Sequence, residues 1–285
     1  MIDLSIVIVN WNTKELLEDC LNSIFKQTKG VKFEVILVDN GSTDGSVEMV
    51  KKKFGEAILI ENKKNLGFAK ANNLGIKKAK GQFILLLNSD TKLVGNALTK
   101  LIDFANTKSN LGIAGPQLLK QDGTIQPSTA PFYTLPITTI SLFKGDKFLR
   151  RSPKKTCQVD WVEGSCFLMS RAVLDKIGLL DEKFFMYIEE MEFCYRAKKA
   201  GFSTWFYPQA QVYHLTRGSL PENKQRVIWW IYEGLIYFYQ KHFAGWQLTV
   251  LKFLLRAKAA LAWLIGFLTA NDYLKQTYGK AFKLA

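Results

Sequence analysis

The chain has 285 residues, enough for one large domain or a domain with an appendage, and 48% of them are hydrophobic, which excludes general disorder. Its four cysteines form no CxxC pair, which argues against a disulfide scaffold or a zinc–thiolate cluster and favours a reducing compartment. The net charge of +14 indicates an anionic substrate, a polyanionic partner or a membrane surface.

The first residues, MIDLSIVIVNWN, have a strand pattern with no basic region before it, so we expect no signal peptide. Further on, short apolar runs alternate with amphipathic segments, the first of which we expect Thr13 to cap. The sequence predicts strands at 4–9, 34–38, 57–61, 83–87 and 112–115, and helices after Thr13 and near 46–54, 67–79 and 95–106. This alternation predicts an α/β fold with a Rossmann-like, mostly parallel sheet flanked by helices.

Polar residues follow three of the strands, at the edge where such sheets bind ligands. They are Asn10 and Asn12, then Asp39-Asn40-Gly41-Ser42, then Asn88-Ser89-Asp90. No GxGxxG or GxxxxGK[ST] motif is present, which argues against a dinucleotide-dependent dehydrogenase and a P-loop nucleotidase.

Two aspartates at these strand ends each have two interpretations. Asp39 either accepts hydrogen bonds from a ribose or a base, or caps a turn in which Gly41 takes a positive φ. Asp90 either helps to bind a divalent cation on diphosphate oxygens, or ends its strand and caps the helix near 95.

The segment 181–201 contains an acidic cluster beside aromatic residues. Crowded, partly desolvated carboxylates raise one another's pKa, as a general base requires. On a helix, Glu189 and Glu192 would share a face. The alternative is a solvated acidic face balanced by Arg196, Lys198 and Lys199.

The chain has two histidines. His214 follows a strand-like stretch at 202–207 and precedes a basic, glycine-containing loop, which favours a role in the site, although a structural role stays open. We expect His242 to be an exposed or snorkelling residue on a helix.

Together these segments resemble the inverting, nucleotide-sugar-dependent glycosyltransferases of family 2, in the bacterial rhamnosyltransferase-like branch. The resemblance covers roughly residues 4–220, in the order of the family. The matching stretches are SIVIVNWN (5–12), VDNGSTDGS (38–46), NLGFAKANNLGI (65–76), FILLLNSDT (83–91), WVEGSCFLMSR (161–171), DEKFFMYIEEMEFCYRAKKAGF (181–202) and HLTRGS (214–219).

The resemblance implies a GT-A fold and a role for each matching residue. It assigns a divalent cation (Mn²⁺ or Mg²⁺) to Asp90 and His214, with Asn88 as a weaker ligand where the family has an acid. It assigns the general base to Glu190, where the family has Asp, with Glu189 as the alternative. Donor-binding residues would be Asn10, Asn12, Asp39, Asn40, Asn65, Asn88, Ser89 and Arg217, and acceptor-side residues Trp161, Glu163 and Gly164.

The expected reaction is a single displacement at the anomeric carbon, moving a sugar from a nucleoside-diphosphate donor to a glycan or lipid-linked acceptor in cell-surface polysaccharide synthesis. The resemblance favours dTDP-rhamnose, with a UDP-sugar as the other donor. A nucleotidyltransferase and a catalytically silent nucleotide-sugar-binding protein are the alternatives.

We expect a catalytic domain at 1–220, with a nucleotide-sugar half (1–115) and an acceptor half (116–220), and a helical appendage at 221–285. Segment 120–158 is expected to be mainly loop, and we interpret its basic cluster Arg150, Arg151, Lys154 and Lys155 as solvated, with contact to an acceptor phosphate as the alternative.

The appendage carries nine Lys/Arg against three Asp/Glu. Its helix at 222–245 should pack on the catalytic domain. Lys252, Arg256 and Lys258 interrupt the apolar run 246–270, which favours an amphipathic helix on a membrane surface over a membrane span. A homodimer contact is the alternative. These features predict a peripheral protein on the cytoplasmic face of the plasma membrane, without a nucleic-acid partner.

Overall fold

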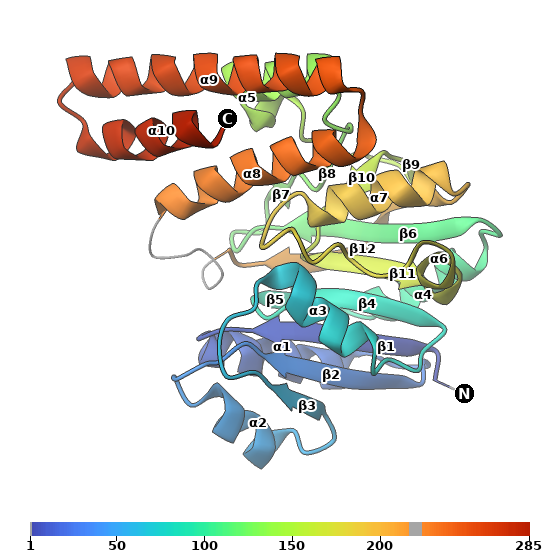
Figure 1. Ribbon diagram of the computed structural model, residues 1–285. Coiled ribbons are helices and arrows are strands. Elements are labelled where there is room, and N and C mark those ends of the chain that lie inside the picture. Colours follow the sequence, from blue (N-terminus) through green and yellow to red (C-terminus); the bar gives the residue numbers. More distant parts are fainter. Residues whose placement is uncertain (1, 217–223) are drawn as a thin grey trace.

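The first part of the chain alternates strands and helices as predicted. The computed structural model describes residues 2–216 and 224–285 (Figure 1). Arg217, predicted to bind the donor, lies outside the described residues. The elements up to residue 119 are β1 (Leu4–Asn10), α1 (Lys14–Gln27), β2 (Phe33–Asp39), α2 (Ser46–Lys53), β3 (Ile58–Glu61), α3 (Phe68–Ile76), β4 (Phe83–Asn88), β5 (Thr91–Leu93), α4 (Ala97–Asn106) and β6 (Leu111–Leu119).

The second part of the chain is more irregular. Its elements are β7 (Ile125–Gln126), β8 (Thr129–Ala130), α5 (Leu135–Lys144), the 3₁₀ helix η1 (Asp146–Phe148), β9 (Cys157–Gln158), β10 (Trp161–Val162), β11 (Cys166–Ser170), α6 (Arg171–Ile177), α7 (Glu189–Lys199), β12 (Ser203–His214), α8 (Lys224–His242), α9 (Gly245–Leu268) and α10 (Asp272–Leu284).

The main sheet has the strand order β3-β2-β1-β4-β11-β6-β12-β5. β1 runs parallel to β2 and β4, with Asn10 opposite Asp39 and Val9 opposite Asn88, so the polar strand ends meet at one edge. β11 is antiparallel to β4 and β6 and lies between them. A strand from the second half of the chain is therefore part of the same sheet as the first half.

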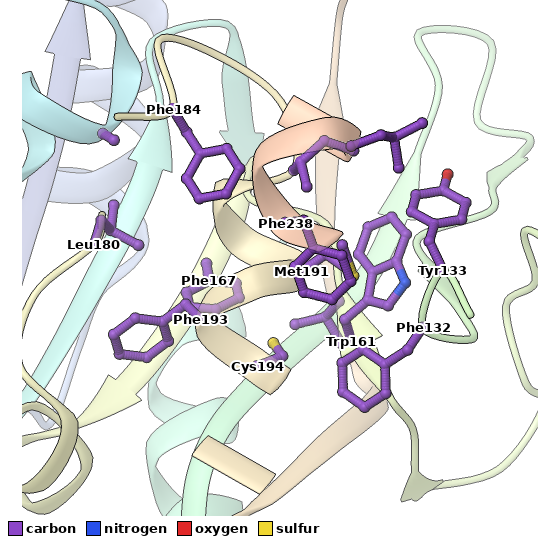
Figure 2. Packing of buried hydrophobic residues seen from close by; sticks show 14 of the residues in the cluster. Phe132, Tyr133, Trp161, Phe167, Leu180, Phe184, Met191, Phe193, Cys194 and Phe238 are labelled. Atoms are coloured by element: carbon purple, nitrogen blue, oxygen red, sulfur yellow. The ribbon is translucent and has the colours of Figure 1, made fainter. Parts of the chain in front are cut away.

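Alternate side chains of the strands are buried in two hydrophobic clusters, one on each face of the sheet. Ile6 and Ile8 face the cluster formed with α1, α2 and α4, whereas Val7 faces the cluster formed with α3, α7 and α8. Figure 2 shows the second cluster, in which Met191 and Phe193 of α7 pack beside Phe167 of β11 and Phe238 of α8. The helix that begins with Glu189 is thus packed in the core through Met191, Phe193, Cys194 and Ala197, whereas Lys198 and Lys199 at its end are exposed.

Segment 120–158 contains more regular structure than predicted, because α5 is a helix of 10 residues. Pro136 lies in its first turn, where proline is tolerated because the N–H would have no partner within the helix.

The appendage consists of helices stacked on the catalytic part of the chain (Figure 1). α8 buries Tyr232, Leu235, Phe238 and Tyr239, and α9 and α10 form a helical hairpin on its outer side. The expectation of an exposed His242 is wrong: its side chain is 7% exposed and its Nε2 lies 2.9 Å from Glu192 Oε1.

Candidate active site

A cavity of about 310 Å³ lies at the carboxyl ends of β1 and β4. Predicted site residues that line it are Asn40, Asn65, Asn88, Ser89, Asp90, Glu163, Gly164, Glu189, Glu190 and His214. Asn10, Asn12, Asp39 and Trp161 are absent from its described lining. The fold therefore brings together the residues predicted for the cation and the base from segments far apart in the sequence.

Asp39 lies behind the cavity wall and is 2% exposed. Its Oδ1 accepts hydrogen bonds from the backbone N–H groups of Gly41 (3.1 Å) and Ser42 (2.8 Å), and its Oδ2 accepts one from Asn10 Nδ2 (3.0 Å). Gly41 has φ +83°, and a Cβ there would lie 2.9 Å from Lys64 Cα. This arrangement matches the interpretation in which Asp39 caps a turn and Gly41 takes a positive φ. Contact of Asp39 with a donor stays a prediction.

Asparagines hold the loops beside this turn. Asn40 Nδ2 donates to Asn65 Oδ1 (3.0 Å), and Asn65 Oδ1 also accepts from the N–H of Gly67 (2.9 Å). Exposed Asn12 accepts from the N–H of Thr43 at 2.8 Å. These side chains shape the wall of the cavity through contacts within the chain.

Thr13 begins α1 without a side-chain cap, contrary to the prediction. Its Oγ1 donates to Asn10 Oδ1 (2.6 Å) and lies 2.8 Å from Ser89 Oγ. The hydroxyl therefore links the ends of β1 and β4 instead of the helix N-terminus.

Asp90 and His214 meet at one side of the cavity because β12 pairs with β5, with His214 opposite Thr91. His214 Nε2 lies 3.4 Å from Asp90 Oδ1, and His214 Nδ1 lies 3.0 Å from Gln126 Nε2. Burial alone would lower the pKa of His214, but the neighbouring Asp90 carboxylate outweighs it and raises that pKa.

Asp90 and His214 fit a divalent cation that keeps positions open for phosphate. Among the described residues no three His, Cys, Asp or Glu side chains form a complete metal cluster. An aspartate and an imidazole at the wall of an open cavity match the sparse protein ligation of a cation that also binds diphosphate oxygens. Asn88 lies on the same wall.

Glu189 and Glu190 begin α7 and face the cavity. The two residues before them, Tyr187 (φ 70°) and Ile188 (φ 74°), have left-handed backbone conformations, which are strained for non-glycine residues and cluster at active sites. The Oε2 atoms of both glutamates are buried and have no hydrogen-bond partner among the described residues. The strained backbone at Tyr187 and Ile188 thus directs the side chains of Glu189 and Glu190 into one cavity.

The two glutamates differ in their affinity for protons. Burial, together with the charge of Glu190, raises the pKa of Glu189 well above its usual value. Burial raises the pKa of Glu190 to about 7. The charge of Arg150 lowers this pKa and the charge of Glu163 raises it. Burial thus favours the protonated form of Glu189 strongly, whereas the pKa of Glu190 lies close to neutral pH.

Glu192 has a different environment from Glu189, although their spacing predicts a shared face. It is fully buried and forms hydrogen bonds with Arg196, Lys241 and His242 at 2.8 to 3.0 Å. Glu192 thus joins α7 to α8. It provides a structural anchor for the helix that carries the two cavity glutamates.

The loop before α7 docks on the start of α3. The N–H of Phe68 donates to the carbonyl of Phe185 at 2.7 Å, and a Cβ on Gly67 would lie 2.5 Å from that oxygen. The glycine of the NLGF stretch is therefore needed for the close contact that places Glu189 and Glu190 opposite β4.

Arg150 and Gln126 also belong to this site. Arg150 lines the cavity and its Nη1 donates to Glu163 Oε2 at 3.1 Å, so the interpretation of Arg150 as a solvated loop residue is wrong. Gln126 lies between Glu163 and His214. Buried Trp161 lies beneath the Arg150 guanidinium, 5.4 Å from the ring centroid.

Residues 5–178 match the model of glycosyl transferase family 2. The chain belongs to this family. The resemblance noted in the sequence is thereby confirmed, and the protein is a glycosyltransferase. Membership argues against the nucleotidyltransferase alternative.

Two relatives show how far the similarity extends. An N-acetylglucosaminyl-diphospho-decaprenol L-rhamnosyltransferase of Mycobacterium tuberculosis is 26% identical over 280 residues, 90% of this chain and 91% of that protein. The low-salt glycan biosynthesis hexosyltransferase Agl10 of Haloferax volcanii is 30% identical over 204 residues, 69% of this chain and 62% of that protein.

Solved structures share the fold. The mannosyltransferase PcManGT of Pyrobaculum calidifontis, in complex with GDP-Man and Mn²⁺, superposes with a TM-score of 0.58 at 16% identity. The match covers 99% of this chain and 84% of the PcManGT chain. GalNAc-T7, with UDP, GalNAc and Mn²⁺, superposes with a TM-score of 0.62 at 18% identity, and the match covers 84% of this chain and 50% of the GalNAc-T7 chain. These matches confirm the predicted GT-A architecture.

Proposed function

We propose that this glycosyltransferase moves a sugar from a nucleoside-diphosphate donor to a hydroxyl group of a glycan or lipid-linked saccharide, with inversion at the anomeric carbon. The observation that carries the proposal is one cavity in which Glu190, with a pKa of about 7, shares the walls with Asp90 and His214. A base that ionises near neutral pH, beside a site suited to a phosphate-bound cation, is what a single displacement requires.

In this reaction the Glu190 carboxylate takes the proton of the acceptor hydroxyl. The acceptor oxygen then forms the new bond to the anomeric carbon while the bond to the diphosphate oxygen breaks, and the electron pair leaves with the diphosphate. Burial favours the neutral form of Glu189, and in that form it adds no second negative charge beside the base. A bound Mn²⁺ or Mg²⁺, held by Asp90 and His214 with Asn88 nearby, would supply positive charge for the departing diphosphate.

We propose dTDP-rhamnose as the donor, with a UDP-sugar as the alternative. The mycobacterial relative is named a rhamnosyltransferase, which supports the first, and GalNAc-T7 was crystallised with UDP. Thermal-shift measurements with UDP, dTDP and GDP, each with Mn²⁺, should show stabilisation by the nucleotide of the true donor, since a ligand that binds only the folded state raises its stability. Donor hydrolysis assays then distinguish a live transferase from a silent binding protein.

We further propose that α9 rests on the cytoplasmic leaflet of the plasma membrane. Its inner side chains are buried: Leu251, Leu255, Ala259, Ala262 and Gly266. The opposite face carries an outer stripe of exposed side chains at helical spacing: Trp246, Val250, Phe253, Leu261, Leu264 and Leu268. Phe253 and Leu268 are 70% and 74% exposed. No described helix has the length and hydropathy to cross a bilayer.

Charge favours a lipid surface over a second copy as the partner of the outer stripe. Lys252, Arg256 and Lys258 flank it, and α9 contains no Asp or Glu. Anionic headgroups attract such residues, whereas a two-fold contact through this face would bring the same cations together. α9 also forms the outermost layer of the molecule in Figure 1.

The variant Phe253→Ser/Leu264→Ser should bind vesicles containing phosphatidylglycerol at least roughly 10-fold more weakly than the wild type, because each side chain contributes buried apolar area. Co-sedimentation measures this, with Ile58→Ser on β3, 38% exposed, as the control. Equal binding by the double variant, or a dimer in analytical ultracentrifugation that the double variant dissociates, would contradict the membrane proposal.

A further inference from the structure

The cavity holds four carboxylates, Asp90, Glu163, Glu189 and Glu190, and among its described lining residues Arg150 alone is a lysine or arginine. The Arg150 side chain is 32% exposed, so its guanidinium is open to the cavity. Among the described lining residues, Arg150 is therefore the side chain suited to an anionic group of a substrate.

The Arg150 guanidinium has unused hydrogen-bonding capacity. A guanidinium has five N–H donors, and within the described chain Arg150 uses Nη1 for Glu163 Oε2. Its position over the Trp161 ring holds the plane of the group. Such an oriented guanidinium is suited to paired hydrogen bonds with phosphate oxygens.

Arg150 lies on the side of the base. Its partner Glu163 precedes Gly164 in the chain, and a Cβ on Gly164 would lie 3.6 Å from Glu190 Cβ. In the other direction Glu163 is linked to His214 through Gln126, whose Nε2 lies 3.4 Å from Glu163 Oε1 and 3.0 Å from His214 Nδ1. A sugar phosphate carries its hydroxyl groups and its phosphate on one ring, so one acceptor molecule can meet both Glu190 and Arg150.

We infer that Arg150 binds a phosphate group of the acceptor, so the enzyme selects a saccharide joined to its carrier through phosphate over a neutral glycan. This inference rests on the proposed function, in which Glu190 receives the proton of the acceptor. Glu163 retains a donor when Arg150 turns to the phosphate, because Gln126 Nε2 lies 3.4 Å from Glu163 Oε1.

Arg151 provides a matched control. It follows Arg150 directly, but it lines a different cavity, of about 900 Å³, with Pro153, Gln158 and Lys198. Its backbone N–H and C=O form hydrogen bonds with the backbone of Thr129. A change of the Arg151 side chain leaves these backbone bonds in place. The two neighbouring arginines therefore differ in which cavity they face.

The test measures KM and kcat with the identified donor and two acceptors: a prenyl-diphosphate-linked N-acetylglucosamine and the octyl glycoside of N-acetylglucosamine. Arg150→Gln should raise the KM of the diphosphate-linked acceptor by roughly 10- to 100-fold, as expected for lost charge-assisted hydrogen bonds. The KM of the neutral acceptor and that of the donor should stay close to wild type. Arg150→Lys should raise the KM of the diphosphate-linked acceptor less than Arg150→Gln does. Arg151→Gln should leave the KM of both acceptors unchanged.

Equal rises in KM with both acceptors would show that Arg150 only supports Glu163, and a rise in the KM of the donor would place Arg150 on the leaving diphosphate; either result overturns the inference while the proposed function stands. A change in kcat common to both acceptors reflects the effect of the Arg150 charge on the pKa of Glu190 and is separate from this comparison. If the wild type transfers to neither acceptor but hydrolyses the donor, the inferred acceptor class is wrong. If it does neither, the proposed function fails first.

Discussion

Glu190→Gln should lower the rate of sugar transfer by roughly 100- to 10,000-fold, the usual contribution of a general base. Glutamine keeps the shape of the side chain but cannot take the acceptor proton. Donor affinity should remain near that of the wild type, because Glu190 contacts the acceptor in this mechanism. Steady-state transfer assays measure the rate, and calorimetry measures donor binding.

Glu189→Gln is the matched control for Glu190→Gln. Burial and the charge of Glu190 raise the pKa of Glu189, so glutamine imitates the neutral form that this environment favours. Its effect should be far smaller. In the wild type the rate should rise as pH increases through the Glu190 pKa of about 7, since the base acts in its ionised form. Burial is the main cause of this value; the charge of Arg150 lowers it, that of Glu163 raises it, and the titration of Glu190 is coupled to that of Glu189. A larger loss in Glu189→Gln than in Glu190→Gln would reverse the assignment.

Asp90→Ala should reduce metal-dependent donor binding by at least roughly 100-fold, because loss of even an outer partner of a metal ligand costs ~10–100-fold in affinity. Titration of the nucleoside diphosphate with and without Mn²⁺, followed by calorimetry, measures the metal-dependent part. The control is Asp103→Ala, which removes an exposed carboxylate from α4. Unchanged Mn²⁺ dependence in Asp90→Ala would remove the proposed metal role of this residue.

Much of the site follows from local sequence patterns. The apolar runs of β1, β2 and β4 are strong strand signals, and parallel strands end at a common edge, so the convergence of Asn10, Asp39 and Asn88 was predictable. The acidic cluster at 181–201 indicated crowded carboxylates, and the family resemblance assigned the base to Glu190; the structure places Glu189 and Glu190 at the start of α7.

Arg150 and Gln126 could not be found in this way, because long-range pairing places them. Gln126 reaches His214 because β7 pairs with β6, and Arg150 reaches the cavity because Arg151 pairs with Thr129. Neither the segment around Gln126 nor the one around Arg150 has a periodic pattern that predicts these long-range contacts. The buried position of His242 depends on the packing of α8 against Glu192 on α7, which no local signal reports.

The most direct measurement is a crystal structure with Mn²⁺ and the nucleoside diphosphate that stabilises the protein most, with manganese located by its anomalous scattering. One manganese peak is expected at Asp90 and His214, in contact with the diphosphate, in the cavity that Glu190 lines. Manganese bound elsewhere, or a diphosphate bound outside this cavity, would contradict the account.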